Sequence, residues 1–244
     1  MVKHDQFDRL RVVLVRTRNP LNIGAVARAM SNFGFFHLRV VNPYEAAFRE
    51  ARSAVGASEV LASAQEYKSV AEAVADCTLV VGATAVGHRK LQQPVKRLES
   101  AAQLIRKRLA SSRVAVLFGS EKIGLKNEDL SHCHWLLRIP TREEHRSVNL
   151  GQAVAICLYE LVRQHKPVGK AEKLQAASEP ARADELERLS TMLLNALGTS
   201  GYLKRCSDAS EEKVRRLVRR LNLAAADAET LLGMLRQMLW KMKP

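Results

Sequence analysis

Between residues 11 and 165 the chain carries five short, mainly apolar runs in which apolar residues are continuous and do not alternate with polar ones. Runs of this kind predict strands buried on both faces, as in parallel sheets. The segments between them have a helical apolar period. In the first, residues 23–33, Asn19 or Asn22 is a candidate N-cap and Gly34 a stop signal. The pattern predicts an α/β fold, a parallel sheet with helices on both faces. The runs are Val12–Val15, Leu38–Val41, Leu79–Val81, Val114–Phe118 and Trp135–Ile139.

A change of pattern divides the chain into two units. Residues 163–170 are polar, contain Pro and Gly and have no apolar period, which predicts a linker. Three helical patterns follow, at residues 186–197, 214–221 and 231–239. We therefore expect an α/β domain over residues 1–165, and a linker with a small all-helical extension over residues 166–244.

The net charge of +14 and the pI near 10.0 favour a polyanionic partner, with nucleic acid as the leading candidate. Aromatic residues make up only 5% of the chain, which favours contacts to the nucleic-acid backbone over extensive base stacking. From residue 166 onward there are 15 basic and 10 acidic residues, net +5, which leaves +9 for the first part. Four arginines of the extension are expected to face away from its apolar stripe, either toward phosphate or simply toward solvent: Arg215, Arg216, Arg219 and Arg220.

Several classes of protein are disfavoured by composition. No apolar run approaches the roughly 18 residues that span a bilayer, and the first residues lack the apolar core of a signal peptide, so we expect a cytoplasmic protein. Cys77, Cys133, Cys157 and Cys206 are scattered, which argues against a disulfide framework or a zinc ribbon.

Common catalytic signatures are also missing. The glycines at 119 and 124 lack the Lys-Ser/Thr that completes a phosphate loop, and the first strand leads into no Gly-x-Gly-x-x-Gly fingerprint. The sequence has no Gly-x-Ser-x-Gly elbow. His132-Cys133-His134 would alternate faces in a strand and has no second cluster to complete four ligands, so we expect no metal.

Three segments share one predicted order of elements, in which a strand ends in a polar loop and a helix of small residues follows: Leu14–Arg28, Val116–Leu125 and Ile139–Ala155. Loops at strand ends that carry glycine and a helix cap are suited to a nucleotide-like ligand. In the third loop, Ser147 or Asn149 is the candidate cap.

These loops resemble the three motifs of the SpoU/TrmH branch of the SPOUT RNA methyltransferases. The resemblance covers about residues 10–165 and rests on Asn22–Arg28, Phe118–Leu125, and Ile139–Pro140 with Ser147–Leu150. It implies a trefoil-knotted core, an S-adenosylmethionine cofactor, and a homodimer whose active site draws on both subunits. Chain-topology rules alone would not predict a knot.

The resemblance also assigns roles to residues. Arg28 would position substrate and stabilise charge, Glu121 would orient Arg28 or a neighbouring helix, and Asn22, Ser147 and Asn149 would complete the catalytic set. Arg18, Arg28 and Lys122 would contact RNA. Lys122 stands where the family usually has Arg, and it lacks the planar fork that grips phosphate. The implied cofactor residues are Ala83, Thr84, Ala85, Gly119, Ile139, Arg146, Ser147, Val148 and Asn149.

Within the family, the first strand begins near Arg11, which leaves little room for an amino-terminal RNA-binding domain. The basic extension, with its segment Glu229–Gln237, is similar to that of members that methylate the ribose 2′-hydroxyl of cytidine or uridine at nucleotide 32 of tRNA. We expect tRNA as the partner. A family enzyme for another tRNA or rRNA nucleotide, or a non-catalytic RNA-binding protein on the same scaffold, remains an alternative.

Overall fold

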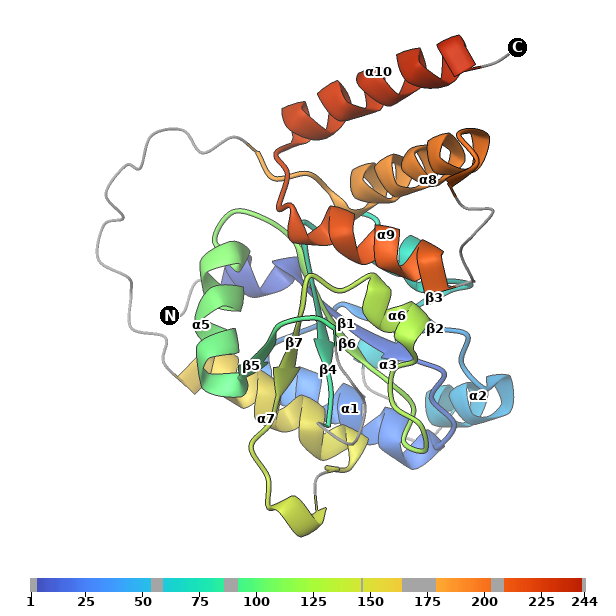
Figure 1. The fold of residues 1–244 in the computed structure, drawn as a ribbon. Helices are drawn as coiled ribbons and strands as arrows, with labels where there is room; N and C mark the ends of the chain where they lie inside the picture. The colour runs from blue at the N-terminus through green and yellow to red at the C-terminus, as the bar shows by residue number, and fades with distance from the viewer. Residues whose placement is uncertain are drawn as a thin grey trace.

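The computed structural model describes residues 4–53, 59–85, 92–145, 147–163, 179–202 and 209–242. Its centre is one seven-stranded sheet in which every pairing is parallel, with the strand order β3-β2-β1-β6-β4-β7-β5 (Figure 1). The predicted parallel sheet is confirmed. The strands are β1 (Leu10–Val15), β2 (Leu38–Val41), β3 (Gln65–Tyr67), β4 (Leu79–Ala83), β5 (Val95–Arg97), β6 (Val114–Phe118) and β7 (Trp135–Arg138).

The five predicted strands are β1, β2, β4, β6 and β7, and the two that were missed are the edge strands. β3 and β5 have three residues each and are largely exposed. A strand at the edge of a sheet with polar side chains buries little apolar surface, so no unbroken apolar run marks it.

Helices cover both faces of the sheet, as predicted. Helices α1, α2, α3, α5 and α7 share one apolar core with β1, β2, β4, β6 and β7, and α4, α6 and the start of α8 share a second core on the opposite face. The bounds are α1 (Pro20–Phe33), α2 (Glu45–Ser53), α3 (Glu59–Ala62), α4 (Val70–Val74), α5 (Leu98–Leu109), α6 (Asn127–Ser131) and α7 (Leu150–Arg163), with the 3-10 helices η1 (His4–Arg9) and η2 (Glu143–His145).

Helix α1 begins and ends where its cap signals predict. The Asn19 side chain accepts a hydrogen bond from Leu21 N, so Asn19 and not Asn22 is the N-cap. Gly34 has φ of 77° and donates its N–H to the carbonyls of Met30 and Ser31. Few residues other than glycine adopt this left-handed conformation cheaply, so Gly34 ends the helix.

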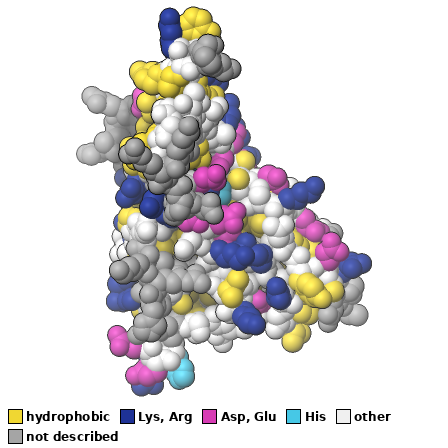
Figure 2. All heavy atoms as spheres, turned by 45° about the vertical axis from the view of Figure 1, so that its right-hand side comes forward, with side chains coloured by type: hydrophobic (Ala, Val, Ile, Leu, Met, Phe, Trp, Pro, Cys, Tyr) yellow, Lys and Arg dark blue, Asp and Glu magenta, His cyan; other side chains and the backbone are white. Residues whose placement is uncertain are grey.

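Three helices form the carboxyl-terminal extension: α8 (Ala183–Thr199), α9 (Ala209–Arg220) and α10 (Ala225–Met242). All three were predicted, and the expected linker lies outside the described residues. Their shared core is small, and apolar side chains such as Met234, Met238 and Trp240 stay exposed. Figure 2 shows apolar side chains on the narrow upper part of the molecule. Helix α8 starts against the sheet domain, where Ala183 N donates to Cys77 O at 2.8 Å.

The described helices include none that is long and apolar enough to cross a membrane.

The prediction that α9 turns its arginines outward is wrong for three of the four. Arg219 is 1% exposed, Arg216 is buried and paired with Glu212, and Arg215 is half-buried, whereas Arg220 is exposed. The reason is that α9 is sandwiched between α6 and α8, so an arginine beside its apolar stripe meets protein and not solvent.

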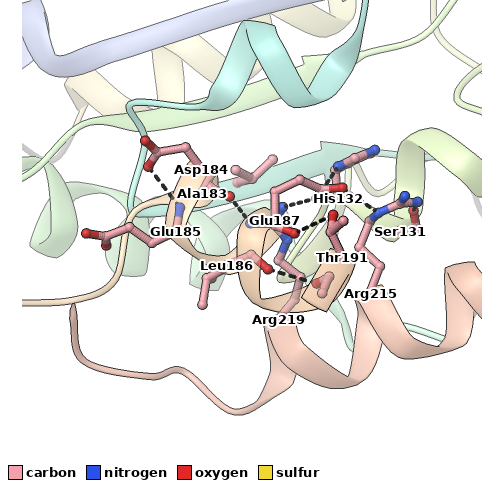
Figure 3. A network of polar contacts seen from close by, with 12 residues as sticks. Ser131, His132, Ala183, Asp184, Glu185, Leu186, Glu187, Thr191, Arg215 and Arg219 are labelled. Carbon is pink, nitrogen blue, oxygen red and sulfur yellow. Dashed lines mark hydrogen bonds and ion pairs between the residues drawn. The ribbon is translucent and has the colours of Figure 1, made fainter. Parts of the chain in front are cut away.

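The buried arginines surround one carboxylate, and we call this group the junction: Ser131, His132, Glu187, Arg215 and Arg219 (Figure 3). Glu187 accepts hydrogen bonds from Arg215 Nε and Arg219 Nη2, both at 3.1 Å. His132 Nδ1 lies 3.6 Å from Glu187 Oε2, which is long for a hydrogen bond and leaves a mainly electrostatic contact. Burial raises the pKa of Glu187, but His132 and the two arginines outweigh it and lower this pKa to about 2.

Candidate functional site

A cavity of about 530 Å³ opens where β4, β6 and β7 end. Because parallel strands bring their carboxyl ends to one edge of the sheet, the loops that follow them meet there. The walls come from the loop after β4, the loop between β6 and α6, and the loop between β7 and α7, with α1 contributing Asn22. A cavity of this size and position is typical of a cofactor-sized ligand.

The cavity gathers most of the residues proposed from sequence. Arg146 lies outside the described residues, and Arg18 and Arg28 do not line the cavity. The structure thus establishes a shared location, while the individual roles stay predictions. The predicted residues that line it are Asn22, Ala83, Thr84, Ala85, Gly119, Glu121, Lys122, Ile139, Ser147, Val148 and Asn149.

The loop after β6 folds back on itself, and glycine makes this possible. A Cβ atom on Gly119 would lie 2.0 Å from the carbonyl carbon of Gly124, which is backbone and has no room to move. Gly124 has φ of 66° and donates its N–H to Ser120 O at 2.8 Å. The loop is therefore tightly closed, with the backbone of Gly119 packed against that of Gly124, and both glycines line the cavity.

The remaining wall is mostly apolar. Leu125, Leu137 and Leu150 are buried side chains that line the cavity, and Ile139 and Val148 are half-buried beside them. Apolar walls with a few placed polar groups suit a planar base and ribose, because the walls hold the base and the polar groups set its orientation.

Three side chains form a hydrogen-bonded chain along one edge of the cavity. Asn22 Nδ2 donates to Glu121 Oε1 at 3.0 Å, and Asn149 Nδ2 donates to Asn22 Oδ1 at 2.8 Å. Asn149 Oδ1 in turn accepts the backbone N–H of Gly151 at 2.9 Å, so Asn149 and not Ser147 caps α7. Glu121 therefore contacts α1 through Asn22, and no described contact joins it to Arg28.

A close approach of two helices makes this chain possible. A Cβ atom on Gly151 would lie 2.7 Å from the Cβ of Ala25, so α7 can pack this near to α1 only because residue 151 is glycine. The approach brings Asn22 on α1 within hydrogen-bonding distance of Asn149 before α7. Small residues in both segments were the available signal in the sequence.

One contact beside the site had no signal in the sequence. Arg16, at the end of β1, has φ of 54° and pairs through both terminal nitrogens with Asp129 of α6. Asp129 Oδ2 also accepts the N–H of Lys126 at 2.6 Å. The pair fixes the start of the segment that leads into α1, next to the loop that closes the cavity.

The basic residues proposed to contact RNA are exposed near the cavity or on α1. Arg18, Arg28 and Lys122 make no hydrogen bond or ion pair with other residues in the part of the chain that the structure describes. Their charges are thus available to an external anion. Lys122 lines the cavity, whereas Arg28 does not.

The His132-Cys133-His134 segment lies away from the cavity and within the protein. His134 is buried, and its Nδ1 accepts the N–H of Val80 at 3.1 Å. Burial and the nearby Arg219 lower the pKa of His134 to about 3, so this imidazole is neutral. Within the described ranges, no group of three or more metal-ligating side chains comes together.

The part of the chain that builds this cavity matches a known protein family. Residues 9–159 match the profile of the SpoU rRNA methylase family. The chain belongs to the SpoU methylase family. The match covers the sheet domain, including all three loops that build the cavity.

Relatives in this family extend the similarity beyond the matched domain. A protein of Sodalis glossinidius named tRNA (cytidine/uridine-2′-O-)-methyltransferase TrmJ is 34% identical over 238 residues, covering 96% of this chain and 93% of its own. A Pseudomonas aeruginosa protein named tRNA (cytidine/uridine/adenosine-2′-O-)-methyltransferase TrmJ is 37% identical and covers 88% of this chain and 84% of its own. Both alignments are long enough to include carboxyl-terminal helices.

Solved structures agree with the sequence relatives. The crystal structure of TrmJ from Z. mobilis ZM4 superposes with a TM-score of 0.80 at 34% identity, covering 93% of this chain and 98% of that one. A probable methylase family protein from Haemophilus influenzae superposes with a TM-score of 0.57 at 30% identity, covering 97% and 98%. The similarity in fold therefore includes the extension.

Proposed function

We propose that the protein is an S-adenosylmethionine-dependent tRNA methyltransferase that modifies a ribose 2′-hydroxyl. The observation that carries the proposal is the extent of the similarity: relatives named as tRNA 2′-O-methyltransferases align over the sheet domain and the helical extension together. The net charge of +14 suits an RNA substrate, because lysine and arginine release counterions from phosphates.

The cavity fits the proposed cofactor on its own chemistry. Its apolar walls suit an adenine ring, and its volume of about 530 Å³ is enough for a ligand of this size. When bound, the cofactor supplies the activated methyl group. The residues that would hold it are those gathered at the strand ends: Ala83, Thr84, Ala85, Gly119, Ile139, Val148 and Asn149.

The chain's own polar residues would then hold the acceptor ribose. A 2′-hydroxyl is weakly acidic, so its attack requires positive charge or a proton acceptor close by. Arg28 would stabilise the developing negative charge, since a guanidinium with a pKa above about 12 is a poor base. Arg18 and Lys122 would neutralise phosphates that flank the target nucleotide.

The position of Arg28 favours a role at the cavity of a second subunit. The residue is exposed on α1 and does not line the cavity of its own chain. The helices α1 and α7, which pack on one another, expose the apolar side chains Leu21, Ile156 and Tyr159. We infer a homodimer in which Arg28 serves the partner's cavity, because buried apolar surface on these helices would stabilise the pair.

Subunit complementation tests the shared site. Arg28→Ala should abolish methyl transfer to tRNA, and Asn149→Ala should slow it. Co-expression of the two variants should restore at least roughly a quarter of wild-type activity, because about half of the dimers are mixed and one of the two sites in each mixed dimer is intact. Arg28→Ala alone should keep its affinity for S-adenosylmethionine. Full activity of Arg28→Ala would remove Arg28 from the reaction centre, and mixed dimers without activity would place both residues in one subunit's site.

The target is proposed to be cytidine or uridine at nucleotide 32 of the anticodon loop, with the protein acting in the cytoplasm. Two related names differ in whether adenosine is also a substrate. Mapping 2′-O-methylation in tRNA from a strain without this gene identifies the nucleotide. Loss of methylation at another tRNA or rRNA site would replace the assignment while keeping the enzyme class.

A further inference from the structure

The amino ends of the strands, at the edge of the sheet opposite the cavity, carry a group of arginines. Arg11 lies in β1, Arg39 in β2, and Arg113 directly before β6. Arg11 pairs in register with Ala115 of β6. Arg39 pairs with Val13, two residues further along β1. Because alternate residues of a strand face the same side of a sheet, the three arginines share one face, which α4, α6 and the start of α8 cover.

Asp76 lies among these arginines and pairs with two of them. It follows α4 and accepts two hydrogen bonds from Arg39, at 2.6 and 2.9 Å, and one from Arg113 at 3.1 Å. Burial raises the pKa of Asp76, but Arg39 outweighs it and holds this pKa well below its ordinary value. Asp76 therefore carries a full negative charge, which balances one of the three guanidinium charges.

Arg11 is the arginine that Asp76 does not reach. It is 7% exposed, and its Nη1 donates to the carbonyl oxygens of Asp8 and Leu10. Within the described residues it forms no ion pair. Carbonyl oxygens satisfy hydrogen bonds but leave the charge of a buried group unbalanced. Burial and then the charge of Arg39 lower the pKa of Arg11, and an anion beside it would offset both effects.

The same edge leaves hydrogen-bond donors open to solvent. The Arg113 side chain is 53% exposed and commits only Nη1 to Asp76, so its Nε and Nη2 have no partner among the described residues. His37 precedes β2 and is exposed, and its imidazole likewise makes no hydrogen bond or ion pair in the described part of the chain. Val12 N donates to His37 O at 3.1 Å, which sets His37 beside Arg11 on the neighbouring strand.

Open donors beside unbalanced positive charge suit an anion. Guanidinium groups bind phosphate through paired N–H groups, and an imidazole N–H can add another hydrogen bond. Two further carboxylates face this edge. Asp8 raises the pKa of His37, against the lowering by burial and Arg11, and Asp184 lies 3.5 Å from its own partner, Arg182. The three arginines thus outnumber Asp8 and Asp76 before His37 is counted.

We propose that Arg11, Arg113 and His37 form a phosphate-binding site at the amino-end edge of the sheet, filled by a backbone phosphate of RNA or by free phosphate. The site is separate from the cavity, since the six residues of β1 set the two edges of the sheet roughly 17–20 Å apart. Of the two sources, only RNA rests on the proposed function.

The contacts of Asp76 also place this site at the seam between the sheet domain and the extension. The carbonyl oxygens of Ala75 and Cys77, on either side of Asp76, accept the N–H groups of Asp184 and Ala183 at the start of α8. A nucleic acid that contacts α8 at its start therefore lies within reach of the site.

Arg113→Gln tests the site without removing a buried group, because Asp76 keeps both hydrogen bonds from Arg39. Arg113→Lys keeps the charge but loses the planar fork. Arg97→Gln is the matched control, since Arg97 is 62% exposed, pairs with one carboxylate, Glu99, and lies at the end of β5.

Binding of free phosphate is measured by the midpoint of thermal unfolding, in phosphate and in chloride of equal ionic strength and pH. Phosphate also stabilises proteins without binding a site, so the variants are compared with one another. At phosphate concentrations about ten times the Kd, the wild type should gain roughly 3–5 °C more than Arg113→Gln. Arg97→Gln should gain as much as the wild type, and all three should have similar midpoints in chloride.

Binding of RNA is measured by the affinity for tRNA at several salt concentrations. Arg113→Gln should bind roughly 3- to 10-fold more weakly, and its slope of log affinity against log salt should be shallower by about one unit, as for one lost phosphate contact. Arg113→Lys should keep the slope and lose part of the affinity. Affinity for S-adenosylmethionine should not change, because the cavity is at the other edge.

The two measurements distinguish the sources of phosphate. Weaker tRNA binding by Arg113→Gln identifies RNA as the ligand, and a lost response to phosphate with unchanged tRNA affinity identifies free phosphate. Equal behaviour of Arg113→Gln and Arg97→Gln in both measurements would overturn the site, because the loss of any surface charge would then have the same effect. Wild-type protein that methylates no RNA would refute the proposed function and leave the response to free phosphate as it is.

Discussion

The cavity edge and the junction are both built around a glutamate, and they use it in opposite ways. Glu121 is exposed and lines the cavity. Its Oε1 accepts a hydrogen bond from Asn22, and its other oxygen accepts none from the described residues. Glu187 faces Arg215, Arg219 and His132 in an interior where the arginine side chains are 16% and 1% exposed. Glu187 thus holds buried side chains of the junction together, whereas Glu121 lies beside a cavity that a ligand can enter.

The junction also explains why a basic helix need not bind RNA. Besides Glu187, each arginine has one further acceptor: Arg215 donates to the hydroxyl of Ser131, and Arg219 donates to the carbonyl oxygen of Ala183 (Figure 3). Buried charges are tolerated only when such partners satisfy them. Positive charge in α9 is therefore largely committed to holding the extension against α6 and α8.

Removing the two glutamates should give the sharpest contrast. Glu187→Ala leaves Arg219 buried without its carboxylate and should lower the free energy of unfolding by about 3–5 kcal/mol. Glu121→Ala removes an exposed group and should change it by less than about 0.5 kcal/mol while slowing methylation. Urea denaturation followed by circular dichroism measures the first quantity, and single-turnover assays measure the second.

A surface pair provides the control for Glu187. Glu229 and Arg188 are each 56% exposed, so Glu229→Ala should cost at most about 1 kcal/mol. If Glu187→Ala cost no more than Glu229→Ala, the junction would not hold the extension in place, and the contrast between the two glutamates would fail.

The same contrast separates what the sequence predicts from what it does not. The five inner strands, the caps of α1 and the loops at the cavity were predictable, because mainly apolar runs, Asn19 and Gly34 act through local chemistry. The edge strands β3 and β5 were not, since short exposed strands need no apolar signal. A helix's own period also does not show which neighbour covers its polar side, which is why Arg219 was misplaced.

Within the candidate site, sequence resemblance predicted the residues better than their contacts. Asn22, Glu121 and Asn149 do line one cavity, but the partner of Glu121 depends on how closely α1 and α7 approach each other at Gly151. The pairing of Arg16 with Asp129 joins residues 113 positions apart and leaves no local pattern. Tertiary distances of this kind become visible only in the folded structure.

The buried His134, near the junction, should make the free energy of unfolding depend on pH. His134 has a folded pKa near 3, below its ordinary value of 6.5, so below pH 6.5 the unfolded chain takes up a proton that the folded chain refuses. Stability should fall by about 1.4 kcal/mol for each pH unit from 6.5 down toward 4.5. His134→Asn, whose oxygen can still accept from Val80, should flatten this slope in urea denaturation.

Another histidine limits how flat the slope of stability against pH can become in this variant. Partial burial also lowers the pKa of His37, so a smaller slope should persist in the variant. An unchanged slope in His134→Asn would show that the buried imidazole is not what limits acid stability.

Asn149 combines a structural role with a place at the site, because it both caps α7 and lines the cavity. Asn149→Ala should weaken cofactor binding and slow methylation, with a loss of roughly 1–3 kcal/mol if one buried hydrogen bond is removed from the complex. Asn149→Asp keeps the capping oxygen and should retain the unfolding midpoint, while it loses the donor to Asn22. Unchanged affinity and rate in Asn149→Ala would remove this residue from the site.

The smallest effects are expected from the charges that the junction leaves free. Lys213 and Arg220 of α9 and Arg236 of α10 are exposed and form no ion pair within the described part of the chain. If the extension binds tRNA, changing these three to Gln should weaken binding and leave the unfolding midpoint unchanged. The slope of log affinity against log salt should also become shallower, by up to about one unit for each phosphate that the variant no longer neutralises.

Arg219→Gln is the opposite case. It should lower the unfolding midpoint by disturbing Glu187, before any interaction with RNA is affected. Equal tRNA affinity and salt slope in the triple variant and the wild type would assign the extension to packing on the sheet domain or to the dimer, and not to RNA.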